Sequence, residues 1–99
     1  MSDTCAVEEA ITHENNKFSF VDPDNSRNPA FLEYSISGNV LDMLHTFVPP
    51  AMRARGVAGA LVKVGLRHAA ARNLSVRTTC WYTADFVKKY GTYGTKIAP

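Results

Sequence analysis

The sequence predicts an α+β fold with an α/β core: a mixed, mostly antiparallel sheet of about five strands, one long crossover helix and a short C-terminal helix. Apolar and polar residues mix at the short spacing of strands through the first half of the chain, between turn-forming pairs. From Val57 onward the apolar spacing becomes helical, and another strand pattern follows. A strand, a helix and a parallel strand in this order form a right-handed βαβ crossover.

Length and composition place the chain among small folded domains. It has 99 residues, of which 45% are apolar and 20% charged. We expect a single domain over residues 1–99, with its core over about 7–90 and tails at 1–6 and 91–99. No apolar run approaches the roughly 18 residues of a membrane span, and no signal sequence is visible. The expected location is therefore intracellular, in the cytoplasm, without a membrane partner.

Four strands are expected in the first half, over Val7–His13, Lys17–Val21, Ala30–Ser37 and Val40–Val48. Asn15-Asn16 and Gly38-Asn39 supply hairpin turns, because asparagine and glycine tolerate positive φ angles. Asp22–Pro29 is rich in turn formers and predicts a surface loop. In the fourth strand, strict alternation places four residues on one face: Leu41, Met43, His45 and Phe47.

The second half begins where Pro49-Pro50 ends the fourth strand, because proline donates no hydrogen bond to a sheet. Val57–Arg72 predicts a helix of about four turns, with apolar residues at helical spacing and several alanines. Leu74–Trp81 alternates again and predicts a fifth strand, parallel to the fourth. Ala84–Tyr90 predicts a short helix that Gly91 ends.

Charge divides the chain near residue 50. Residues 1–50 hold two basic and eight acidic residues, whereas residues 51–99 hold nine basic residues and one acidic residue. The overall charge of +2 hides this asymmetry. Clustered positive charge indicates that the second half faces an anionic partner.

Two cysteines, Cys5 and Cys80, lie far apart without CxxC spacing, so no disulfide framework is expected. A metal site formed by His45, Cys80 and a carboxylate lacks ligand spacing, and we expect no metal. His68 and His13 are expected to be packed and on the surface, respectively. The remaining aromatic residues considered, Trp81 and Phe86, are expected in packing.

The segment from His45 to Gly59 runs from a strand through a short basic loop directly into a helix. A helix N-terminus presents free N–H groups and partial positive charge, and Arg53 and Arg55 add donors suited to phosphate. This pattern predicts a phosphate or pyrophosphate site, although neither GxxxxGK[ST] nor GxGxxG is present. The alternative is a solvated basic loop whose glycine packs the helix on the sheet.

Arg53-x-x-Gly56-x-Ala58 resembles the acetyl-coenzyme A motif of the GNAT superfamily of N-acetyltransferases. Together with His45-Thr46-x-Val48-Pro49 before it and Cys80-x-Tyr82 after the helix, it is similar to the minimal small-domain subfamily. The resemblance covers roughly residues 7–90 and implies a minimal GNAT-like fold. Ala58 replaces the motif's second glycine, a variant the superfamily accepts.

The resemblance implies a site for acetyl-coenzyme A as cosubstrate. The strand before the motif would splay from its parallel neighbour, and the backbone near Val48 would bind the pantetheine arm. The pyrophosphate would lie against the motif, whose residues are Arg53, Arg55, Gly56, Val57, Ala58 and Gly59. The subfamily's active-site pair would correspond to His45 and Cys80.

Chemically, acetyl transfer to an amine needs a base for the amine and a proton donor for the departing thiolate. His45 suits the first task near neutral pH. Cys80 suits either a proton path or a covalent acetyl-enzyme, and the sequence leaves both routes open. Tyr82 is a second candidate donor, with packing in the core as its alternative role.

Two other functions remain open at this stage: a coenzyme A or acyl-coenzyme A binding module without efficient catalysis, and a small basic-faced domain that binds RNA. The absence of interleaved exposed aromatics argues against RNA. The amine acceptor is unknown. Glu33, Asp42 or loop carboxylates are candidates to attract a cationic acceptor, with solvated surface charge as the simpler interpretation.

Overall fold

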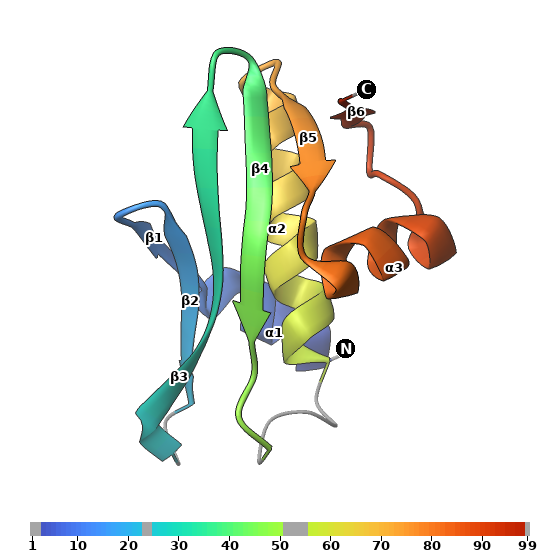
Figure 1. The fold of residues 1–99 in the computed structure, drawn as a ribbon. Coiled ribbons are helices and arrows are strands. Elements are labelled where there is room, and N and C mark those ends of the chain that lie inside the picture. The colour runs from blue at the N-terminus through green and yellow to red at the C-terminus, as the bar shows by residue number, and fades with distance from the viewer. Residues whose placement is uncertain (1–2, 23–24, 51–55, 99) are drawn as a thin grey trace.

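One six-stranded sheet, in the order β1-β2-β3-β4-β5-β6, carries the fold (Figure 1). The computed structural model describes residues 3–22, 25–50 and 56–98. The strands are β1 (Thr12–Glu14), β2 (Lys17–Asp22), β3 (Asn25–Ser37), β4 (Val40–Phe47), β5 (Ser75–Thr78) and β6 (Lys96–Ile97). The helices are α1 (Asp3–Ala10), α2 (Val57–Ala71) and α3 (Trp81–Tyr90). The expected α+β class with a mixed sheet is confirmed.

The first four strands form an antiparallel meander joined by tight turns. Asn15 and Asn16 both adopt positive φ angles, and so does Gly38, as the turn pairs predict. β5 then pairs in parallel with β4, and α2 forms the crossover between them. The predicted βαβ unit is therefore present.

Both α1 and α2 lie on the same face of the sheet, behind the strands in Figure 1. Buried residues of β2, β3 and β4 alternate toward α2 and form one core, which includes Phe18, Leu32 and Met43. A Cβ atom at Gly65 would lie 2.9 Å from Met43 Cε, so glycine allows α2 to approach the sheet closely. Across the part of the chain described, the opposite face of β3 and β4 carries no helix (Figure 1).

A β-bulge in β4 changes which residues face the core. Glu33 pairs with His45 but the next residue, Tyr34, pairs with Met43, so Leu44 is the extra residue. Leu41 and Met43 are buried, whereas His45 and Phe47 are exposed. The prediction that these four residues share one face is therefore wrong, because strict alternation assumes a strand without a bulge.

The N-terminal segment differs from its prediction. The sequence predicts a tail over 1–6 and a strand over Val7–His13, and the structure has helix α1 followed by the short strand β1. Val7, Ala10 and Ile11 follow helical spacing, and Val7 and Ile11 pack on the core. The Glu8 carboxylate also accepts a hydrogen bond from Arg67 of α2 at 2.5 Å. These contacts with the core and with α2, and not local helix propensity, stabilise this short helix.

The C-terminal tail also has structure that the sequence does not predict. Residues 96–97 form β6, which pairs in parallel with β5. Thr95 is buried and its hydroxyl donates a hydrogen bond to the Leu66 carbonyl oxygen at 2.7 Å. Two residues are too few to give a periodic signal, so this strand depends on tertiary contacts.

Some predicted boundaries move. The expected loop over Asp22–Pro29 is mostly strand, since β2 reaches Asp22 and β3 begins at Asn25. β4 ends at Phe47, before Val48, and β5 ends at Thr78, so Cys80 is not a strand residue. α3 begins at Trp81, three residues before the expected Ala84. None of the helices in the described ranges is long and apolar enough to cross a membrane.

Candidate active site

The two central parallel strands separate at their carboxyl ends. Their last register pair is Met43 with Thr78, and one more hydrogen bond follows, from the Cys80 amide to the Met43 carbonyl oxygen at 2.9 Å. The chain then turns into α3, with Cys80 in extended geometry as its N-cap, while β4 continues to Phe47. Figure 1 shows the resulting gap between the end of β4 and the start of α3.

A cavity of about 490 Å³ occupies this gap. Its walls come from β4 and the residue after it, from the start of α2 and from the start of α3: Thr46, Phe47, Val48, Gly56, Ala58, Gly59, Trp81 and Tyr82. The carboxyl ends of diverging parallel strands are a general place for ligands in open sheets. The cavity is the candidate active site of this chain.

The N-terminus of α2 forms one wall of the cavity. Its cap residue, Gly56, has φ 72° and ψ 19°, a left-handed geometry that favours glycine, and makes no side-chain capping bond. No acidic residue lies in the first turn. Because the first amide N–H groups of a helix have no intrahelical partner, this wall presents donors and positive potential to the cavity.

Cys80 lies beside the cavity and is only 8% exposed. Its Sγ lies 3.7 Å from the hydroxyl oxygen of Thr46, which lines the cavity. Burial alone would raise the pKa of Cys80, but hydrogen bonds from the Thr83 backbone, the Thr46 side chain and neighbouring amides bring this pKa below its ordinary value. The start of α3 thus favours the thiolate form.

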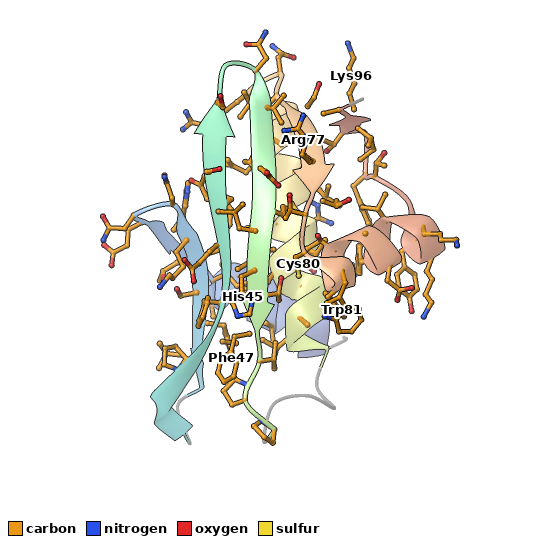
Figure 2. The ribbon with its side chains drawn as sticks, in the orientation of Figure 1. His45, Phe47, Arg77, Cys80, Trp81 and Lys96 are labelled. Carbon is orange, nitrogen blue, oxygen red and sulfur yellow. The ribbon has the colours of Figure 1, made fainter. Side chains whose placement is uncertain are left out.

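His45 lies on the other side of the sheet. The bulge turns its side chain to the face without helices, where its ring lies 5.8 Å from that of Phe31. Thr46, the next residue, points to the side of Cys80. Among the described residues, no hydrogen bond joins His45 to Cys80, although His45 near the end of β4 and Cys80 at the start of α3 both lie near the gap (Figure 2).

Two aromatic residues of α3 line the cavity. Tyr82 is half-buried, and its pKa is raised first by burial and then by the nearby Tyr90 and Asp85. It therefore keeps its proton at neutral pH and is a possible donor. Trp81 is 77% exposed and its ring lies 5.9 Å from that of Tyr82. An exposed tryptophan at a cavity mouth differs from the packing role that the sequence predicts for it.

Four of the expected cofactor residues line the cavity: Val48, Gly56, Ala58 and Gly59. Val57 is fully buried in the core, so only its backbone is available to a ligand. Arg53 and Arg55 lie outside the described residues. Sequence reasoning missed Thr46 and Phe47 as cavity residues, and only their position beside His45 in the resemblance pattern pointed to them.

Within the described ranges, no group of three or more histidine, cysteine or acidic side chains is arranged to hold a metal ion. His13 of β1 and His68 in the last turn of α2 instead lie close together, at the opposite end of α2 from the cavity. Their rings lie 4.6 Å apart, and His13 also stacks on Phe18 and hydrogen-bonds to the Tyr34 hydroxyl. His68 is packed, as expected.

Comparisons with known proteins agree with this geometry. A family model described as GCN5-related N-acetyl-transferase matches residues 17–97. Protein NATD1 of Bos taurus is 35% identical over 81 residues, which are 80% of this chain and 72% of the relative. Protein NATD1 of Homo sapiens is 33% identical over 81 residues, which are 80% of this chain and 72% of that relative.

A solved structure is similar as well. The solution structure of a GCN5-like protein from Staphylococcus aureus matches this fold with a TM-score of 0.70 and 26% sequence identity. The match covers 89% of this chain and 86% of that chain.

Proposed function

Since the chain belongs to the GCN5-related N-acetyltransferase family, we propose that it binds acetyl-coenzyme A in the cavity and transfers the acetyl group to an amine. The open cavity between β4 and α3, at the N-terminus of α2, is the observation on which this proposal depends. An intracellular, cytoplasmic location is part of the same proposal, since acetyl-coenzyme A is an intracellular metabolite.

The cavity residues fit such a cosubstrate. A pyrophosphate needs close approach to donors, and the N-terminus of α2 offers them beside Gly56, Ala58 and Gly59, which carry small side chains or none. A pantetheine arm needs an apolar slot with backbone groups, and in the described part of the chain the register pairs of β4 with β5 end at Met43. Val48 lies at this edge and lines the slot.

In the proposed reaction, the amine nitrogen forms a bond to the acetyl carbon while the carbon–sulfur bond of the thioester breaks. One amine proton passes to a base and the thiolate leaving group takes up a proton. His45 is our candidate for the base, since it lies on the open face of the sheet at the end of β4. Cys80 and Tyr82 are the candidate proton donors on the opposite side, next to the cavity.

A covalent route remains a second proposal, because the lowered pKa of Cys80 favours a nucleophilic thiolate. Here the Cys80 thiolate would form a bond to the acetyl carbon as the carbon–sulfur bond of acetyl-coenzyme A breaks, and coenzyme A would leave and take up a proton. The amine would then form its bond to the acetyl carbon as the Cys80 thioester breaks, which releases the Cys80 thiolate, while a base takes one amine proton. Intact mass spectrometry after mixing with acetyl-coenzyme A distinguishes the routes. An adduct of one acetyl group that Cys80→Ala abolishes supports the covalent route, and turnover without such an adduct supports direct transfer.

Binding is the first test of the proposal. Coenzyme A and acetyl-coenzyme A at millimolar concentration should raise the melting temperature, because a ligand that binds only the folded state stabilises it. No shift with either compound would refute the proposal. A shift without acetylation of any amine would indicate a coenzyme A binding module.

The dependence of binding affinity on salt concentration distinguishes a cosubstrate site from an RNA-binding surface. A protein that neutralises several phosphates of RNA loses much of its affinity between low and moderate salt. One enclosed cosubstrate should show a shallower dependence. Binding of RNA with a steep salt dependence, together with no response to coenzyme A, would favour the RNA-binding alternative.

A further inference from the structure

Two of the three histidines of the chain meet in a cluster of rings at the end of α2 opposite the cavity. We define the ring cluster as His13 of β1, Phe18 of β2, Tyr34 of β3 and His68 of α2. The centroids of the two imidazole rings lie 4.6 Å apart, and the ring planes are inclined at 76°. His13 also stacks on Phe18, with the ring centroids 4.2 Å apart. The cluster therefore joins three neighbouring strands to the last turn of the central helix.

The ring cluster holds β1 and its turn on the rest of the fold. β1 is an exposed strand of three residues at the edge of the sheet (Figure 1). The Nε2 atom of His13 hydrogen-bonds to the Tyr34 hydroxyl, and the Tyr34 amide donates a hydrogen bond to the Asn16 carbonyl oxygen at 3.0 Å. Phe18 is 1% exposed, and the His13 ring covers it. Charge on these rings therefore affects how strongly β1 is held.

The carboxylates around the ring cluster are engaged or directed elsewhere. The charged side chains on the elements around it are, in chain order, Glu8, Glu9, Glu14, Lys17, Glu33, Arg67 and Arg72. Glu14 and Lys17 are register partners, and each adjoins a cluster residue in sequence. Strand alternation therefore places both of them, and Glu33 of β3, on the opposite face of the sheet. Glu8 of α1 forms an ion pair with Arg67. These placements direct the carboxylates away from the two imidazoles.

A second positive charge in the ring cluster is costly. Protonated His13 donates its Nε2–H to the Tyr34 hydroxyl oxygen, so this hydrogen bond persists after the first proton binds. A proton on His68 then places a like charge on the neighbouring ring, beside Arg72. The C-terminal end of α2 favours positive charge, but burial, His13 and Arg72 outweigh this effect and lower the pKa of His68. Once β1 moves away, the two rings separate and each binds a proton.

We propose that the ring cluster is a proton-operated latch on the edge of the sheet. At neutral pH it holds β1 and the turn at Asn15-Asn16, and below about pH 6.5 the second proton releases them and uncovers Phe18. The first proton alone leaves the latch closed, because the hydrogen bond between His13 and Tyr34 persists. The latch residues differ from the residues that line the cavity, so this inference stands apart from the acetyl transfer proposed above.

Hydrogen exchange followed by NMR measures the opening of the latch, with each rate corrected for the intrinsic exchange at that pH. If the open form binds one more proton, its population should rise by up to about tenfold per pH unit as the pH falls from about 6.5 toward the lower folded pKa of His68. The reporters are the amides of β1 and the Tyr34 amide, which donates to Asn16. A population of the open form that does not change with pH would overturn the proposal.

Urea at low concentration separates local opening from global unfolding. Release of β1 exposes little surface, so exchange of its amides should not depend on urea, whereas amides that pair β4 with β5 should exchange faster as urea is added. The same urea dependence at both places would mean that β1 is released only in global unfolding, which contradicts the latch. Dispersed NMR spectra check that the protein and each variant remain folded through the pH range.

Histidine variants identify the protons. His68→Gln should reduce the pH dependence of β1 exchange to near zero, since the closed and open forms then bind the same number of protons. His13→Phe keeps a ring on Phe18 and should raise the pH at which the Cε1–H resonance of His68 titrates. His45→Phe is the matched control, because His45 lies exposed on the opposite face of the sheet, and both measurements should equal those of the parent protein. An unchanged pH dependence in His68→Gln, or an unchanged His68 titration in His13→Phe, would overturn the proposal.

Discussion

A single extra residue in β4 decides how the two candidate catalytic side chains are arranged. Leu44 occupies the bulge, so Thr46 lies 3.7 Å from Cys80 while His45 turns to the opposite face. If both side chains take part, they act on different sides of the bond that is broken. The pKa of the Cys80 thiol is then lowered by hydrogen bonds from Thr46 and the start of α3 instead of by an imidazole.

This arrangement predicts the reactivity of Cys80. In a Cys5→Ser background, Thr46→Val should raise the pKa of Cys80, because it removes a hydroxyl that stabilises the thiolate. Alkylation by iodoacetamide at neutral pH should slow several-fold, since the thiolate is the reactive form. The pH dependence of the alkylation rate measures the change.

Thr46→Ser is the matched control, since it keeps the hydroxyl and loses only a methyl group. Its alkylation profile should remain close to that of the parent protein. Identical profiles for the valine and serine variants would show that the Thr46 hydroxyl does not influence Cys80.

His68 carries a second prediction at this scale. Burial, the neighbouring His13 and Arg72 lower the pKa of His68 in the folded state. Further charged groups on the elements around it are Glu14 on β1, Lys17 on β2 and Glu8 on α1. Because the unfolded histidine titrates near pH 6.5, the unfolded state binds more protons just below that pH.

The neutral form of His68 therefore contributes stability that is fully present above about pH 6.5 and is lost as the pH falls toward its lower folded pKa. Urea unfolding between pH 7 and pH 5 should show this decrease, and His68→Gln should flatten it. A His68→Gln variant with an unchanged pH dependence would mean that other groups cause the decrease.

At the scale of elements, both ends of the chain gain structure from contacts with α2. α1 docks through Val7 and the Glu8–Arg67 ion pair, and β6 docks on β5 next to the buried Thr95. The Tyr93 ring also lies within 6 Å of Lys63 Nζ and Arg67 Cζ, at 5.9 and 5.8 Å. Contacts with α2 thus stabilise terminal segments whose sequences have no clear periodic pattern.

Thr95→Val tests the anchoring of the tail. It removes the hydroxyl that donates to Leu66 and should lower the free energy of unfolding by about 1 kcal/mol, the typical net value of such a bond. Urea titration measures the change. Thr95→Ser keeps the donor and should cost less. Equal losses for the two variants would assign the effect to packing of the methyl group.

Gly59 offers a way to separate stability from binding. A Cβ atom there would lie 3.4 Å from Phe86 Cε2 and 3.9 Å from the Tyr82 hydroxyl, which are ordinary contacts. Gly59→Ala should therefore raise stability by about 0.5–1 kcal/mol through helix propensity. It should weaken coenzyme A binding, because the methyl group narrows the cavity beside α2. Calorimetry and titration measure both, and unchanged affinity would place the cosubstrate away from Gly59.

At the scale of the whole molecule, the acidic and basic halves of the sequence do not form separate bodies. β4 from the first half pairs with β5 from the second, and α2 packs on β2, β3, β4 and β5. Val7 near the N-terminus and Val76 in the last quarter of the chain belong to the same buried cluster. We therefore propose that the chain is one domain, and expect it to unfold as one cooperative unit.

Val7→Ala and Val76→Ala test this unity. Each should lower the same unfolding midpoint, at a cost of about 1–3 kcal/mol, because each removes buried methyl groups from one core. Circular dichroism and hydrogen exchange should report coincident transitions with similar m-values. A separate early transition of α1 in the Val7→Ala variant would show that α1 unfolds independently.

Much of the fold follows from sequence. The meander of β2 to β4, the Gly38 turn and the crossover helix over Val57–Ala71 have strong periodic or turn signals, and the structure contains them. The wall made by Gly56, Ala58 and Gly59 follows as well, because a glycine-containing loop that opens a helix has a local geometry.

Only the tertiary structure decided the rest. The bulge at Leu44 has no sequence period, and it reversed the expected face of His45 and Phe47. α1 and β6 are too short for a local signal and depend on docking against α2 and β5. Sequence by itself determined the family and the position of the glycine-containing turn that opens α2, since both reside in contiguous residues. The face on which His45 lies and the contact of Cys80 with Thr46 were decided by strand register, which is a property of the whole sheet.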